Sequence, residues 1–252
     1  FGVNPMAKNI LIKNIITVIV LCFLFSCSDN KKNITDKEIT IKMVTHGQAT
    51  DPFWSVVSNG AKDAAKELGV NLHYQSPQNF DMITMSQMID AVVATKPDGL
   101  IISVPDIPAL RKSVVSASKN NIPIIVINAG VDIMKEADIL TYVGQSEYEA
   151  GLKAADEMLK YNVKSVLCIN HEIGNISLDQ REKGFRKILK ENNVVIKTVP
   201  IDASDPSETQ EVVRAFISSN KKVDGILTLG PLGAVPILKL LKEIDMQKKI
   251  KL

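Results

Sequence analysis

Residues 39–54 read ITIKMVTHGQATDPFW, which predicts a strand, a polar turn and the start of a helix. The apolar residues between Ile39 and Val44 indicate the strand. Gly47 is typical of a turn. Asp51 followed by Pro52 is typical of a helix start, because a carboxylate caps free backbone N–H groups and proline suits the first helical position.

Two aromatic residues, Phe53 and Trp54, lie on the first turn of this helix, and Trp54 is the only tryptophan of the chain. Ligands of open α/β sheets bind beside the carboxyl ends of the strands. An aromatic face near hydrogen-bonding groups suits a sugar or polyol, which presents C–H faces and hydroxyls. Alternatively, both aromatics hold the helix against the core, as buried aromatics commonly do. A ligand wall predicts that Trp54→Ala weakens binding with little loss of stability, and a core role predicts the reverse.

Beyond this stretch, predicted strands and helices alternate to the end of the chain. The first helix has small apolar residues at helical spacing, which we expect to face the core: Val56, Val57, Gly60, Ala61, Ala64, Ala65 and Leu68. Further strands are predicted over residues 70–74, 98–104, 123–128, 140–144, 164–170, 194–201 and 224–229, and one begins at 249. Helices are predicted over residues 80–95, 107–120, 146–161, 177–191, 206–219 and 232–244.

This alternation indicates the fold class. Strands separated by helices of such length form parallel sheets with right-handed crossovers. The pattern restarts after Gly144. We therefore predict an α/β fold with two Rossmann-like lobes, an N-terminal lobe over residues 38–145 and an incomplete C-terminal lobe over residues 146–252.

The composition is that of an ordinary globular protein. The chain has 252 residues, of which 45% are hydrophobic and 23% charged, and its formal net charge is +2. This near-neutral balance argues against a nucleic-acid partner. Cys168 lies inside an apolar strand and is expected to be a small buried residue.

The N-terminal residues 1–27 have the pattern of a secretory signal, with lysines before an apolar run over residues 15–25. The run ends in Leu24-Phe25-Ser26-Cys27, which resembles a bacterial lipoprotein signal with Cys27 as the lipidated residue. A plain signal peptide or an uncleaved anchor remains the alternative. Residues 28–37 are polar and are expected to form a flexible tether. We therefore expect an exported protein of the periplasm or cell envelope that contacts the membrane only through a lipid anchor.

Six motifs indicate a family by their order and spacing, and they lie at residues 51–54, 97–102, 122–128, 143–151, 181–185 and 223–226. The chain resembles the periplasmic sugar-binding proteins of bacterial ABC transporters, of the ribose- and galactose-binding type (periplasmic binding protein type I). That fold is shared with the ligand-sensing domain of lactose-repressor-type regulators. The resemblance covers residues 37–252 and rests on these six motifs together.

The resemblance implies a monomeric solute-binding protein without cofactor. Its two lobes would close about a hinge on a monosaccharide or polyol, and the closed form would deliver the ligand to a membrane permease. It also implies further strands beyond Leu252. The implied ligand-binding residues are Asp51, Phe53, Trp54, Asn128 and Arg181. Arginine offers several fixed N–H donors and asparagine offers both donor and acceptor, which suits ring oxygens and hydroxyls.

The chain departs from the family pattern at three positions, so the ligand need not be ribose or galactose. Gly230 lies where members often have Asn or Asp, Ala129 where the ribose type often has Arg, and Ser177 where the galactose type has Asp. Other polar residues at the same edge are alternative ligand contacts, or else solvated loop residues: His46, Gln48, Asn170, His171, Glu172 and Asn175. No third residue lies at a spacing from His171 and Glu172 that is typical of a metal site, so we expect no bound metal.

Three other functions use similar α/β folds. A transcriptional regulator needs a DNA-binding segment before residue 39, where this chain has the signal sequence. A doubly wound enzyme is not indicated by motif, because no glycine-rich phosphate loop or nucleophile elbow follows a predicted strand. A catalytic site built from scattered residues would leave no such motif, so this alternative stays open. A binding protein that serves a chemoreceptor or signalling partner would use the same fold, and the sequence does not separate it from transport.

Overall fold

The structure is a computed structural model that describes residues 38–47, 51–219 and 222–252. The predicted signal sequence, the Cys27 lipidation site, the tether and Gln48 therefore lie outside the described residues. Residues 38–252 form one compact unit. Among the described residues, no helix is both long and apolar enough to span a membrane.

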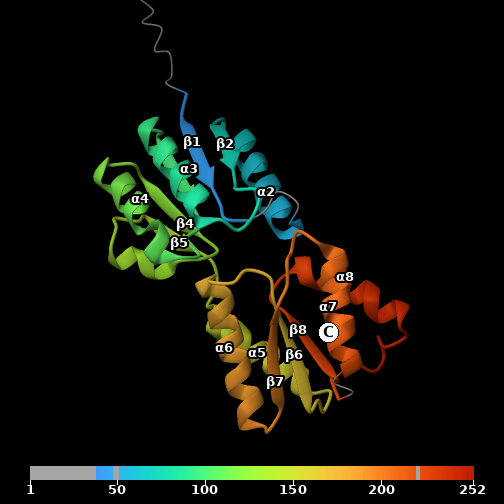
Figure 1. Ribbon diagram of the computed structural model, residues 1–252. Helices are drawn as coiled ribbons and strands as arrows, with labels where there is room; N and C mark the ends of the chain where they lie inside the picture. Colours follow the sequence, from blue (N-terminus) through green and yellow to red (C-terminus); the bar gives the residue numbers. More distant parts are fainter. Residues whose placement is uncertain (1–37, 48–50, 220–221) are drawn as a thin grey trace, which may run out of the picture. The chain divides into compact units, whose positions relative to one another are not determined.

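The first lobe is built on a parallel sheet of five strands in the order β2-β1-β3-β4-β5 (Figure 1). The strands are β1 (Thr40–Val44), β2 (Asn71–Gln75), β3 (Gly99–Ile102), β4 (Ile124–Ile127) and β5 (Thr141–Val143). The connecting helices are α2 (Pro52–Leu68), α3 (Met82–Ala94), α4 (Ile107–Lys119) and the short 3₁₀ helix η1 (Val131–Lys135). The sequence did not predict η1.

The second lobe contains a parallel sheet of three strands in the order β7-β6-β8. The strands are β6 (Ser165–Asn170), β7 (Val195–Pro200) and β8 (Gly225–Thr228). Its helices are α5 (Glu147–Leu159), α6 (Ile176–Glu191), α7 (Pro206–Ser219) and α8 (Pro231–Glu243). The strand expected to begin at 249 is represented by a single parallel bridge between Lys251 and Gly225. The predicted fold class is confirmed, whereas the residue limits of the lobes stay a prediction.

Each lobe has its own apolar core. In the first lobe, Val44, Ile102 and Val126 from three neighbouring strands are fully buried beneath α3 and α4. In the second lobe, successive residues of β6 point to opposite faces of the sheet. Val166 packs with residues of α5 and α6 such as Phe185, whereas Leu167 packs with residues of α7 and α8. The cores fix the strands, and the polar residues that follow the strands are thereby held at one edge.

The apolar stripe predicted for α2 is partly wrong. The buried residues of this helix are Trp54, Ser58 and Ala65, whereas Val56 is 72% exposed. Val56 lies about 200° around the helix from Trp54, on the opposite face. Leu68 shares the inner face but lies in the last turn and is exposed. Trp54 and Ala65 therefore lie on the inner face of α2, whereas Val56 faces solvent.

Candidate functional site

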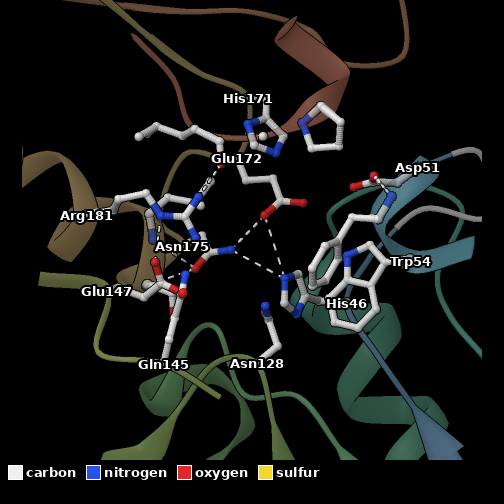
Figure 2. Close-up of a pocket in the computed structure, with 16 residues that line it drawn as sticks. His46, Asp51, Trp54, Asn128, Gln145, Glu147, His171, Glu172, Asn175 and Arg181 are labelled. Carbon is white, nitrogen blue, oxygen red and sulfur yellow. Dashed lines mark hydrogen bonds and ion pairs between the residues drawn. The ribbon is translucent and has the colours of Figure 1, made fainter. Parts of the chain in front are cut away.

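A cavity of about 250 Å³ lies where the carboxyl ends of strands from both lobes come together (Figure 2). Sites for drug-sized ligands usually measure roughly 300–1,000 Å³, so this cavity suits a smaller molecule. It is lined by His46, Asp51, Phe53, Trp54, Asn128, Gln145, Glu147, His171, Glu172, Asn175, Ser177, Leu178, Arg181, Leu229, Gly230 and Pro231.

The start of α2 supplies one wall. The Asp51 carboxylate accepts a hydrogen bond of 2.8 Å from the Phe53 backbone N–H and caps the helix, as predicted. Burial raises the pKa of this carboxyl above its ordinary value. The ring of Phe53 is edge-on to that of Trp54, with 5.1 Å between centroids. Phe53 is 44% exposed and Trp54 is 3% exposed, so the two aromatics have different environments.

Trp54 lies directly over the turn after β1. A Cβ atom placed on Gly47 would lie 1.6 Å from the indole Cδ1, so only glycine leaves room for this ring. The imidazole of His46 meets the indole edge-on at 4.9 Å. Trp54 therefore lines the cavity and also packs tightly in the first lobe, a combination that neither alternative drawn from the sequence describes alone.

His46 is buried at the end of β1 and belongs to the interior of the first lobe. Its Nδ1 lies 2.7 Å from the Ser103 hydroxyl, which also accepts a hydrogen bond from the His46 backbone N–H. Burial, and then the neighbouring His171, lowers the pKa of His46 to about 3. His46 is therefore neutral near pH 7, and its 3.7 Å approach to the Glu172 carboxylate is not an ion pair there.

The second lobe supplies Arg181, which Figure 2 shows with Glu147 and Gln145 on the side of the cavity opposite Asp51 and Trp54. Its Nε donates to the buried Glu147 carboxylate at 2.6 Å, and Nη1 donates to the Leu229 carbonyl at 2.7 Å. Gln145 donates to the other Glu147 oxygen at 3.2 Å. No described residue accepts a hydrogen bond from Nη2 of Arg181.

Two glycines explain how Arg181 meets Glu147. A Cβ atom on Gly151 would lie 2.0 Å from the backbone oxygen of Arg181, and one on Gly184 would lie 2.1 Å from that of Tyr148. Helices α5 and α6 therefore approach backbone to backbone at these positions. This close packing brings the first turn of α5, with Glu147, next to the arginine of α6.

Asn175 caps α6 and joins the two lobes. Its side-chain oxygen accepts from the Ser177 N–H at 2.9 Å, and its amide nitrogen donates to Glu172 at 2.6 Å and lies 3.4 Å from Nε2 of His46. Burial raises the pKa of the Glu172 carboxyl to about 7, against the lowering effect of the Asn175 hydrogen bond. Because both ends of the Asn175 amide are occupied, this residue positions Glu172 and has little capacity left for a ligand.

The sequence profile of the periplasmic binding protein domain matches residues 41–252. The chain belongs to this family. The periplasmic-binding protein YphF of an Escherichia coli ABC transporter is 28% identical over 163 residues, which are 62% of this chain and 49% of that protein. The chain thus spans about half the length of the curated relatives it matches.

Two solved structures of sugar-binding relatives are similar to this periplasmic binding protein domain. A periplasmic sugar-binding protein from Legionella pneumophila is 26% identical, with a TM-score of 0.78 over 83% of this chain and 78% of that one. A carbohydrate transporter protein from Acidothermus cellulolyticus 11B, in complex with myo-inositol, is 30% identical, with a TM-score of 0.78 over 84% of this chain and 73% of that one.

Most of the site residues expected from the sequence line the cavity of this periplasmic binding protein domain: Asp51, Phe53, Trp54, Asn128, Arg181, His46 and Asn175. Asn128 has a φ of 60°, in the left-handed region where asparagine is tolerated, and its side-chain amide makes no hydrogen bond with a described residue. Contact of these residues with a ligand stays a prediction.

Sequence reasoning missed Gln145 and Glu147, although both lie within a motif that indicated the family. Burial of Glu147 depends on the approach of α5 and α6, and the only signal for that approach is the pair of glycines. The described residues contain no group of three or more His, Cys, Asp or Glu side chains placed to hold a metal ion. Cys168 is buried, and burial raises the pKa of its thiol.

Proposed function

We propose that this periplasmic binding protein domain captures a neutral monosaccharide or cyclic polyol for an ABC transporter. The observation that supports this most directly is the composition of the cavity. The half-exposed ring of Phe53 offers an apolar face, and Nη2 of Arg181 and the amide of Asn128 offer donors that no described residue uses. A sugar or polyol has both C–H faces and hydroxyls that match these groups.

The charges of the cavity favour a neutral ligand. Three buried carboxyl groups, those of Asp51, Glu147 and Glu172, share the cavity with the single guanidinium of Arg181. All three accept hydrogen bonds within the site and retain oxygen lone pairs that can accept from hydroxyls. An anionic ligand would bring a further negative charge close to these carboxyls, where the low dielectric makes repulsion costly. The relative that binds myo-inositol, itself a neutral cyclic polyol, supports the same ligand class.

A calorimetric binding screen tests the ligand class. The panel is myo-inositol, D-ribose, D-xylose, D-glucose and D-galactose, with D-glucuronate and D-glucose 6-phosphate as anionic counterparts of one hexose. We expect saturable binding of at least one neutral compound and at least tenfold weaker binding of the anions. Failure of every neutral compound to bind would overturn the proposal.

We further propose that the lobes close about a hinge when the ligand binds, and that the closed monomer docks on a membrane permease. Contacts from both lobes to one ligand would favour the closed form. Small-angle scattering with and without the bound sugar should show a more compact particle. Co-purification with a chemoreceptor or histidine-kinase partner, and with no permease, would favour the signalling alternative. The family's proteins bind substrates, and we propose that this chain likewise performs no catalysis.

Export and lipid attachment are proposed from the sequence alone. The run that ends in Leu24-Phe25-Ser26-Cys27 would place a lipidated Cys27 at the mature N-terminus, followed by the tether of residues 28–37. Each buried CH₂ of an acyl chain contributes about 0.8 kcal/mol, so several chains would anchor the protein firmly. Cys27→Ala should move the protein from the membrane fraction to the soluble fraction of a bacterial host. Equal membrane retention of the variant and the parent would contradict lipidation.

A further inference from the structure

The space beside Gly230 is filled by the imidazole of His171. His171 follows β6 and Gly230 follows β8, and these strands are neighbours in the second sheet. The backbone of Gly230 is extended, with a φ of −173°, a conformation that any residue adopts. A Cβ atom placed there would nevertheless lie 2.6 Å from Cε1 and 2.8 Å from Nε2 of His171. A side chain at position 230 would therefore displace the imidazole, whereas the backbone conformation does not require glycine.

The nitrogens of this imidazole lack partners. Neither forms a hydrogen bond with a described residue, and Nδ1 is buried out of reach of solvent. Burial, and then the charge of Arg181, lowers the pKa of His171 to about 4, so the ring is neutral near pH 7. Buried polar atoms in native proteins nearly always have a partner. A group that enters the cavity is available to provide it, because His171 is part of the cavity wall, as Figure 2 shows.

We propose that His171 binds one hydroxyl of the ligand and determines specificity at that hydroxyl, in the space where a side chain at position 230 would otherwise lie. The inference rests on the proposed function. A neutral imidazole has one donor and one acceptor nitrogen, and a hydroxyl both donates and accepts. Rotation of the ring by half a turn exchanges the places of nitrogen and carbon, so either nitrogen can face the hydroxyl. His171 thus selects for a hydroxyl without adding charge to the cavity.

The test combines a substitution with changes in the ligand. His171→Phe keeps a ring against Gly230 and removes both nitrogens. For the neutral compound that the parent binds best in the panel above, each monodeoxy derivative is titrated against the parent and the variant. We expect the variant to bind the intact compound about 5- to 100-fold more weakly, since one hydroxyl loses its partner. One monodeoxy derivative should bind the parent more weakly than the intact compound does, by a similar factor. The variant should bind that derivative and the intact compound with equal affinity.

Two controls separate this role from a structural one. His73→Phe makes the same change at an exposed histidine of β2 and should leave every affinity unchanged. Gly230→Ala forces the imidazole to move and should weaken binding by a factor close to that of His171→Phe. In a His171→Ala background, Gly230→Ala should cause no further loss of affinity, because the imidazole that the new side chain would displace is absent. Thermal melting confirms that each variant is folded.

The outcomes are distinct. One outcome is that the parent binds a neutral compound while His171→Phe shows the same relative affinities for the monodeoxy derivatives as the parent does. In that case the role proposed for His171 is wrong and the proposed function stands. If Gly230→Ala has the same effect with and without the imidazole, the steric relationship between the two positions is wrong and the inference fails. If the parent binds none of the panel, the proposed function fails and this inference fails with it.

Discussion

The two lobes hold their cavity residues in different ways. In the first lobe, Trp54 is packed over Gly47, and His46 lies between the indole and the Ser103 hydroxyl. In the second lobe, Arg181 is held by hydrogen bonds to Glu147 and to the Leu229 carbonyl, and it keeps donors for a ligand. Packed residues contribute mainly to stability, whereas residues with unused hydrogen-bonding groups can contribute to affinity. The contrast predicts that substitutions in the two lobes affect different measurements.

Trp54→Ala should have the largest effect, and it should appear in stability. The indole is 3% exposed and contacts Gly47, His46 and Phe53. Removing a buried large aromatic typically costs about 3–5 kcal/mol of unfolding free energy. Urea unfolding of the variant and the parent, followed by circular dichroism, measures the loss.

Phe53→Ala is the matched control on the same helical turn. Its ring is 44% exposed, so we expect a loss of about 1 kcal/mol or less in stability, because little buried area is removed. Its affinity for the bound sugar should fall, since the exposed ring is the apolar face of the cavity. A stable Trp54→Ala protein beside a strongly destabilised Phe53→Ala protein would reverse the assignment of the two rings.

Arg181→Ala should weaken ligand binding more than any other single substitution in the second lobe. Charge-assisted hydrogen bonds contribute about 1.5–3 kcal/mol each, so we expect a loss of affinity of roughly 10- to 100-fold. The substitution also leaves the buried Glu147 carboxylate without its cation, which destabilises the fold. Calorimetry and thermal melting on the same preparation measure both effects.

A double variant separates the two contributions of Arg181. Arg181→Met with Glu147→Gln removes the pair together, so no buried charge is left unpaired and much of the stability should return. The affinity should stay low, because the guanidinium is still absent. Arg111→Ala, which breaks an exposed pair with Glu136 on the first lobe, should change neither measurement by more than about 1 kcal/mol. Recovery of affinity in the double variant would show that Arg181 only neutralises Glu147.

The sequence predicted the fold well because the fold depends on local patterns. The alternation of apolar runs and capped helices is sufficient to indicate parallel sheets, and Asp51 caps α2 as its position before Pro52 predicts. The inner face of α2 was predicted less well, because Trp54, which packs against the turn at Gly47, occupies part of it. Val56 consequently faces solvent although its residue type suggests the core.

Arg181 was predicted from the family resemblance, whereas residue patterns alone predicted the site only where a residue follows a strand or begins a helix. Asp51, Asn128 and Asn175 could be placed at the correct edge in this way. Glu147 could not, because its burial depends on the close approach of the α5 and α6 backbones. His171 could be placed at this edge, but its contact with Gly230 could not be predicted. Glycines at 151 and 184 mark that approach, and Gly230 leaves the space that the imidazole fills.

The last predicted effect, smaller than that of Trp54→Ala, concerns Glu172, whose hydrogen bond to Asn175 lies where the two lobes meet. Its carboxyl has a pKa of about 7 in the folded chain, raised from the ordinary 4.5 chiefly by burial. Between these values the folded chain holds a proton that the unfolded chain has released, so raising the pH lowers stability. Glu172→Gln resembles the protonated carboxyl and lacks this titration. The unfolding free energy of the parent minus that of the variant should therefore fall as the pH rises from about 4.5 to about 7.

We expect this difference to change by on the order of 1–3 kcal/mol, because each unit by which the pKa is raised corresponds to about 1.4 kcal/mol. The lowered pKa values of His46 and His171 act in the opposite sense, since protons taken up by the unfolded chain below about pH 6.5 destabilise the fold. Both histidines are present in both proteins, so the difference isolates Glu172. Urea titrations at several pH values from 5 to 8 measure it. A difference that rises with pH would mean that Glu172 is ionised in the folded chain and that charge, as well as packing, joins the two lobes.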